Sequence, residues 1–150
     1  METEPSGPTD AESPPPRHAG KPIVAVFNSS SDTVDLLRTA LEGHGFQTVI
    51  GHIPEVKSGQ LDIIEFIESH APSVIVYDIS PPYDANWTFL RLVRSALPVK
   101  TRRFILTTTN KPALENLVGE TEAIEIIGKP YDLLQVVEAV RAALGQTPSA

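Results

Sequence analysis

Three polar residues of different chemistry each follow a short apolar run. Asp78 ends one run, Thr107 follows a second over 104–106, and Lys129 comes two residues after a third segment, 124–127, which is apolar except for Glu125. Unbroken runs of β-branched and aromatic residues are typical of strands covered on both faces of a parallel sheet. In open α/β sheets, ligands bind at the carboxyl ends of such strands. A carboxylate, a hydroxyl and an ammonium group at these ends therefore form a candidate site.

Each of these residues also has an ordinary structural role open to it. Asp78 could cap a loop, Thr107 could cap the helix that follows it, and Lys129 could be a solvated surface charge. Their joint position at strand ends favours a functional role over these alternatives.

Strands and helices alternate along the chain from about residue 21 to residue 145. Apolar runs predict strands at 23–27, 46–50, 73–78, 104–106 and 124–127. Apolar residues at helical spacing predict a first helix ending at Gly43 and further helices at 61–69, 86–97, 112–118 and 133–144. In the third helix we expect Phe89, Leu90, Val93 and Leu97 to face inward. The segment 51–60 carries Gly51, Pro54 and Gly59 and is predicted to be a loop.

Five strands separated by helices imply right-handed crossovers and one parallel sheet. We predict an α/β fold: a doubly wound five-stranded parallel sheet in the order 2-1-3-4-5, a flavodoxin-like (αβ)5 three-layer sandwich. In this order the first and third strands are neighbours, so Asn28 and Ser29 face Asp78 across the crevice. The fourth and fifth strands bring Thr107 and Lys129 to the same edge.

Charge and composition exclude several classes of protein. A net charge of -7 and a pI near 5.0 argue against non-specific binding to nucleic acid or to an anionic membrane. There is no cysteine, which excludes disulfides, thiolate metal sites and cysteine nucleophiles. The apolar runs are too short for a membrane span or a signal peptide. We therefore expect a soluble, cytoplasmic protein with no nucleic-acid or membrane partner.

The first 20 residues differ in composition from the rest of the chain. They contain five prolines and four acidic residues, with almost no aliphatic side chain that could be buried. Such a segment cannot offset the entropy of ordering. We predict a disordered tail over 1–20, one domain over 21–145 and a flexible C-terminus over 146–150. No effector region follows this domain, so a stand-alone module is expected.

Three motifs at the strand ends together carry a family resemblance. Residues 74–82 read Val-Ile-Val-Tyr-Asp-Ile-Ser-Pro-Pro, residues 105–107 read Ile-Leu-Thr, and residues 128–131 read Gly-Lys-Pro-Tyr. These three motifs are similar, in the same order, to the phospho-acceptor strand, the hydroxyl position and the Lys-Pro-aromatic signature of one family. The spacing between Thr107 and Lys129 also fits that family. Over 22–145 the chain resembles the receiver domain of two-component response regulators.

The resemblance implies phosphorelay signalling and no enzyme activity beyond chemistry at the protein's own aspartate. Asp78 would accept a phosphoryl group from a histidine kinase or a phosphotransfer protein. Mg²⁺ and Lys129 would neutralise charge on the phosphoryl oxygens, and Thr107 would shift toward the phosphate. A downstream protein, or a second copy of the chain, would bind the face formed by helix 112–118, strand 124–127 and helix 133–144.

The residues at the expected metal site differ from the family pattern. Receivers carry two adjacent acids after the first strand, and this chain has Asn28 and Ser29 there. Mg²⁺ would then be held by Asp78, the backbone carbonyl of Ser80 and these two uncharged residues. Losing one carboxylate about 4 Å from a cation forfeits on the order of 4 kcal/mol at an effective dielectric near 20. Mg²⁺ binding is therefore expected to be weak or absent.

Other residues near the site do not repair this loss. We expect Asp32 in the first turn of the first helix, where stabilising the helix dipole is the favoured role, and Asp84 in the loop after Pro82. Ile126 stands where many receivers carry an aromatic switch residue. The usual coupling of Thr107 to an aromatic side chain is therefore not predicted.

Two functions of different classes remain open. One is a stand-alone phospho-receiver in which Asp78 is phosphorylated despite a weak metal site. The other is a pseudo-receiver, in which Lys129 pairs permanently with Asp78 and partners bind a fixed surface without phosphorylation. A third, less favoured, is flavin binding, because residues 29–33 resemble the hydroxyl-rich phosphate loop of flavodoxins but lack its glycine.

Overall fold

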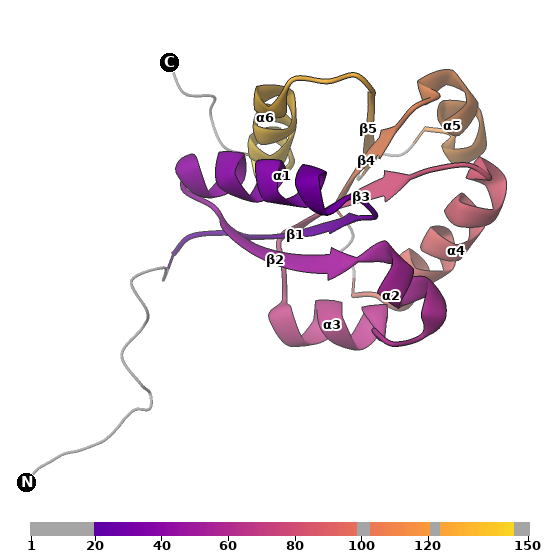
Figure 1. Cartoon of the computed structure of the whole chain (residues 1–150), viewed down its shortest axis with the longest axis horizontal. Coiled ribbons are helices and arrows are strands. Elements are labelled where there is room, and N and C mark those ends of the chain that lie inside the picture. Colours follow the sequence, from indigo (N-terminus) through magenta and orange to yellow (C-terminus); the bar gives the residue numbers. More distant parts are fainter. Residues whose placement is uncertain (1–19, 99–102, 121–123, 146–150) are drawn as a thin grey trace, which may run out of the picture.

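The computed structural model describes residues 20–98, 103–120 and 124–145 and contains one five-stranded parallel sheet (Figure 1). The strands are β1 (Ile23–Asn28), β2 (Gln47–His52), β3 (Val74–Ile79), β4 (Phe104–Thr108) and β5 (Ile124–Gly128). Their order is β2-β1-β3-β4-β5, and every neighbouring pair is parallel. The predicted fold class and strand order are confirmed. The predicted tails, over 1–20 and 146–150, lie outside the described residues except for Gly20.

Six helices in the described ranges cover the two faces of the sheet (Figure 1). They are α1 (Ser31–Gly43), α2 (Ile53–Ser58), α3 (Ile63–His70), α4 (Tyr83–Ala96), α5 (Lys111–Val118) and α6 (Leu133–Ala143). Helices α1 and α6 pack on one face, and α2, α3, α4 and α5 pack on the other. None of these helices is long and apolar enough to cross a membrane.

Side-chain caps explain where several helices begin. The Ser30 hydroxyl accepts a hydrogen bond from the backbone of α1, and Asp62 does the same for α3. Asn110 caps α5 in the same way, and Asp132 forms a capping box with Gln135 at the start of α6. Polar side chains therefore cap the helices that follow β1, β4 and β5, whereas α2 and α4 begin without a side-chain cap.

The prediction of a loop over 51–60 is wrong in two places. Gly51 lies inside β2 and is paired with Phe27, where a Cβ atom would come 2.3 Å from a carbon of the Phe27 ring. The chain then enters α2, which has Pro54 in its first turn, where the missing N–H costs no hydrogen bond. A glycine needed for close packing and a proline at a helix start were both read as loop residues.

The start and the buried face of α4 also differ from the prediction. The helix begins at Tyr83, three residues before the expected start. Its buried side chains are Trp87, Leu90 and Val93, whereas Phe89 is 41% exposed. The expectation that Phe89 faces inward is therefore wrong.

Alternation along the strands sends side chains to two separate cores. In β3, Ile75 and Tyr77 join the core under α2, α3, α4 and α5, whereas Val74 and Val76 join the core under α1 and α6. Because the period is two residues, Asp78 follows Val76 toward the α1 and α6 side. The same count places Thr107 two residues after Ile105 on that side.

Candidate functional site

Asp78, Thr107 and Lys129 meet at the carboxyl edge of the sheet. Asp78 lies one residue before the end of β3 and is in register with Thr107 of β4. Lys129 follows directly after β5. The Thr107 hydroxyl donates a 2.7 Å hydrogen bond to Oδ1 of Asp78, and Lys129 Nζ lies 2.6 Å from the same oxygen. The structure thus brings together the three residues that the sequence placed at the ends of the strands.

This cluster is almost enclosed by protein. Asp78 is 6% exposed and Thr107 is 1% exposed, while the Lys129 side chain is 31% exposed. A buried carboxylate is costly unless it is paired and hydrogen-bonded, and Lys129 and Thr107 supply both interactions. The formal charges of Asp78 and Lys129 cancel.

The two oxygens of the Asp78 carboxylate have different surroundings. Oδ1 receives both the ammonium and the hydroxyl, whereas Oδ2 accepts no hydrogen bond from any residue in the described ranges. The Oδ1 contacts hold the carboxylate in one orientation. One oxygen is therefore held in place and the other keeps its lone pairs available.

Asn28 lies at the same edge, on β1. Phe27 is in register with Tyr77, so Asn28 takes the next position along, beside Asp78. Asn28 is 4% exposed, and its Oδ1 accepts a 3.0 Å hydrogen bond from the Ser30 backbone N–H. This local turn leads into α1. Ser29 is exposed, and neither Asn28 nor Ser29 is hydrogen-bonded to Asp78 within the described residues.

The backbone carbonyl of Ser80 has a partner that sequence reasoning missed. The side-chain amide of Asn86, in the first turns of α4, donates a 2.7 Å hydrogen bond to this carbonyl oxygen. Nothing in the sequence marks this contact, because it depends on where α4 begins after Pro82. Asn86 is thus a further residue at the edge.

Two tyrosines lie within the field of the Asp78 carboxylate. Burial raises the pKa of Tyr77 to about 12, and the negative charge of Asp78 adds to the shift. Burial and then the charge of Asp78 also raise the pKa of the Tyr131 phenol. Both phenols therefore stay protonated at neutral pH. Tyr131 packs beside the core under α1 and α6, directly after the Lys129-Pro130 pair.

No protein-family model and no curated protein sequence matches the chain, but solved structures do. A response regulator from Thermotoga maritima superposes with a TM-score of 0.60 at 19% identity, covering 84% of this chain and 99% of that one. The chemotaxis protein CheY4 of Vibrio cholerae gives 0.62 at 16% identity, covering 82% and 98%. The signal receiver domain of a putative Luxo repressor protein from Vibrio parahaemolyticus gives 0.64 at 18% identity, covering 83% and 91%.

The chain has the fold of response-regulator receiver domains. At identities of 16–19% the likeness establishes this receiver fold alone, and the functional argument rests on the site residues. In the receiver fold of this chain, Asp78 and its two partners occupy the ends of β3, β4 and β5.

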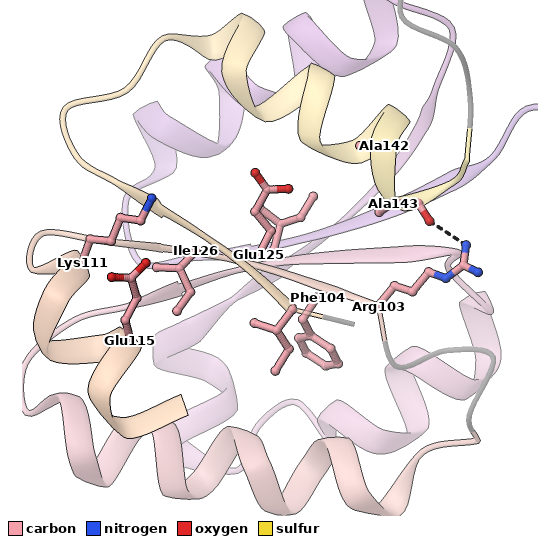
Figure 2. A pocket seen from close by; sticks show the side chains of 10 residues that line it. Arg103, Phe104, Lys111, Glu115, Glu125, Ile126, Ala142 and Ala143 are labelled. Atoms are coloured by element: carbon pink, nitrogen blue, oxygen red, sulfur yellow. Dashed lines mark hydrogen bonds between the residues drawn. The ribbon is translucent and has the colours of Figure 1, made fainter. Parts of the chain in front are cut away.

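A hollow on the receiver fold lies beside the edge strand β5, between α5 and α6 (Figure 2). Glu125 and Ile126 line it from β5, and Lys111 and Glu115 line it from α5. At its other end Arg103 donates a 2.6 Å hydrogen bond to the carbonyl of Ala143, the last residue of α6. We call this surface the α5–β5–α6 face; it comprises the helices and strand that the sequence predicted for partner binding.

Proposed function

We propose that the protein is a cytoplasmic receiver module of a phosphorelay and accepts a phosphoryl group on Asp78 from a histidine kinase or a phosphotransfer protein. One observation carries this proposal: Asp78 keeps Oδ2 free of hydrogen bonds among the described residues, while Lys129 and Thr107 hold Oδ1. A nucleophile needs an available oxygen in a fixed orientation, with positive charge close by.

The chemistry uses the donor, this cluster and a proton from solvent. Oδ2 of Asp78 attacks the phosphorus in line with the bond to the donor's imidazole nitrogen. The O–P bond forms as the P–N bond breaks, and the imidazole leaves with a proton from solvent. Lys129 Nζ, at 2.6 Å from Oδ1, neutralises charge on the phosphoryl oxygens, and the Thr107 hydroxyl donates to one of them. The product is an acyl phosphate on Asp78.

The oxygens at this edge do not fit a resident Mg²⁺ ion. Among the four residues that the resemblance indicated for the metal, Asp78 is the one carboxylate, and the Asn28 and Ser80 oxygens already accept hydrogen bonds. Across the part of the chain that the structure describes, no three His, Cys, Asp or Glu side chains cluster in a way that could hold a metal. Mg²⁺ prefers near-octahedral oxygen ligands, usually with one or two carboxylates. We therefore propose that Mg²⁺ binds weakly.

We propose the α5–β5–α6 face as the surface that a downstream protein, or a second copy of the chain, recognises. Glu125 and the pair Lys111 and Glu115 place charges of both signs around the hollow in Figure 2. Lys129 links this face to the site, since it follows β5 and reaches Asp78. A change at Asp78 thereby moves the Lys129 ammonium group, a charge beside the end of β5 and this face.

One observation favours a second function, the phosphorylation-independent pseudo-receiver. Lys129 already neutralises Asp78 at 2.6 Å, so the resting site resembles a finished ion pair. In this function partners bind the α5–β5–α6 face as it stands.

Phosphodonor chemistry separates the two functions. The full chain is incubated with phosphoramidate or acetyl phosphate and followed by intact mass and amide NMR. Addition of one phosphoryl group in the wild type, none in Asp78→Asn, and normal addition in Asp84→Asn supports the receiver. Asp84 is a suitable control because it is an exposed carboxylate nearby, in the first turn of α4. No addition to the wild type, with or without Mg²⁺, would overturn the receiver and leave the pseudo-receiver.

A further inference from the structure

We infer that the Asp78 site is built to work without a divalent cation, and that the side-chain amide of Asn86 occupies the place at the Ser80 carbonyl where a cation would coordinate. This inference deepens the proposed function. Its first part, that the reaction proceeds without a divalent cation, rests on the proposed function. The cation-binding part stands on the contacts of Asn86 and Asn28 alone.

The charges at the edge leave no need for a cation. Asp78 contributes one negative charge and Lys129 one positive charge, and they lie 2.6 Å apart. Asn28 and Ser29 add none. A divalent ion placed among these groups would leave the cluster with two uncompensated positive charges, beside an ammonium group that repels it. The resting site is neutral as it stands.

The Ser80 carbonyl is directed toward a donor of the protein itself. Asn86 Nδ2 lies 2.7 Å from the Ser80 oxygen, and the contact is partly buried. The backbone N–H of Asn86 donates to the Pro82 carbonyl at 3.1 Å, so the first turn of α4 holds this side chain in position. A cation approaching the Ser80 oxygen would meet the positive hydrogens of the amide. The amide would have to move away before coordination could occur.

The Asn28 oxygen is committed in a similar way. Its Oδ1 accepts the Ser30 N–H at 3.0 Å, in the turn that leads to the start of α1. Ser30 in turn caps α1 through the Thr33 N–H at 3.2 Å. Turning the Asn28 oxygen toward a cation would leave a backbone donor without its partner at this helix start. Both uncharged oxygens at the edge thus serve the fold.

Two measurements test the inference on the full chain. The first compares phosphorylation rates with phosphoramidate in EDTA and in Mg²⁺. In this step the Asp78 Oδ2–P bond forms, the P–N bond of phosphoramidate breaks, and ammonia leaves after protonation by solvent. We expect the wild-type rates in the two conditions to agree within about twofold, because Lys129 supplies the positive charge. The second measurement is a titration with Mg²⁺ followed by amide NMR and by the fluorescence of Trp87, the single tryptophan and the neighbour of Asn86.

The decisive variant is Asn28→Asp with Asn86→Asp, which replaces both committed amides by carboxylates. We expect it to show saturable Mg²⁺-dependent shifts, and the wild type to show none at the same concentrations. Asn110→Asp is the control: it adds one negative charge, as Asn86→Asp alone does, at the start of α5, where aspartate caps as well as asparagine. If the double variant does not fold, Asn86→Asp alone gives the test, because a carboxylate is favourable near a helix N-terminus.

Each outcome decides between the inference and its alternative. A wild-type rate at least tenfold lower in EDTA overturns the inference but leaves the proposed function intact. If the wild type is not phosphorylated in either condition, the proposed function fails and the titration decides. Saturable Mg²⁺ binding by the wild type at the concentrations that saturate the variant then overturns the inference, as does failure of the folded Asn86→Asp variants to gain Mg²⁺ binding. Binding gained by these variants, and absent from the wild type and Asn110→Asp, supports it.

Discussion

Removing Lys129 should destabilise the protein far more than removing the charge of Asp78. In Lys129→Met the Asp78 carboxylate stays 6% exposed and keeps the Thr107 hydroxyl as its hydrogen-bond partner. In Asp78→Asn the Lys129 ammonium loses its partner, but its side chain is 31% exposed and can turn into water. A buried charge left without its ionic partner is the costlier of the two defects.

The distance and burial set the expected magnitude. At 2.6 Å and an effective dielectric of about 20, the Coulomb attraction is about 6 kcal/mol. Desolvation of Asp78 offsets much of this, and solvent screens the partly exposed Lys129. We expect Lys129→Met to cost about 3 kcal/mol, Asp78→Asn to cost less than about 1 kcal/mol, and the coupling between the two sites to be about 2 kcal/mol.

Urea unfolding of the wild type, both single variants and the double variant at pH 7 measures the coupling as a double-mutant cycle. The double variant should be more stable than Lys129→Met by about 1–2 kcal/mol, because no buried charge remains. A coupling below about 0.5 kcal/mol would refute the reasoning, because such values are typical of exposed ion pairs. Equal costs for the two single variants would refute it as well.

Three further predictions follow from local features. The raised pKa of Tyr77 means that the folded state keeps its proton between about pH 10 and 12 while the unfolded chain loses it, so stability is full below pH 10 and is lost as pH rises through 12. Urea unfolding should show that the free energy of unfolding falls by about 1 kcal/mol between pH 9 and 11 because of Tyr77. This part of the fall should be absent in Tyr77→Phe. Gly51→Ala should lower the free energy of unfolding by about 1–3 kcal/mol, since its Cβ would meet Phe27 at 2.3 Å; Gly43→Ala, with no atom within 4 Å, should not lower the melting temperature. Ser30→Ala removes the cap of α1 and should cost about 1 kcal/mol in thermal unfolding, a cost that an unchanged melting temperature would contradict.

Much of the fold could be predicted because its signals are local. The run from Val74 to Tyr77 has no polar alternation, and the sheet covers it on both faces. Alternating strands and helices then limit the topology to very few arrangements. Once the order was set, the meeting of Asp78 with Lys129 across β4 followed from it, although the two residues are far apart in the sequence.

The features that were missed depend on tertiary geometry. The six residues of α2 look like a loop because they follow Gly51 and carry Pro54, and only the packing against Phe27 explains that glycine. The contact of Asn86 with Ser80 exists because α4 begins at Tyr83. A start three residues later, as the sequence suggested, would have left Asn86 at the end of the loop.

The attachment of Lys129 limits what kind of motion a change at Asp78 can cause. The backbone N–H of Lys129 donates a 2.7 Å hydrogen bond to the Thr108 carbonyl, independently of the side chain. The ammonium group can therefore exchange one partner for another while the backbone of residue 129 remains held against β4. A signal that leaves Asp78 by this route is a change in the rotamer of the Lys129 side chain while its backbone stays in place. Such changes take nanoseconds or less in exposed residues, and they need no movement of a strand.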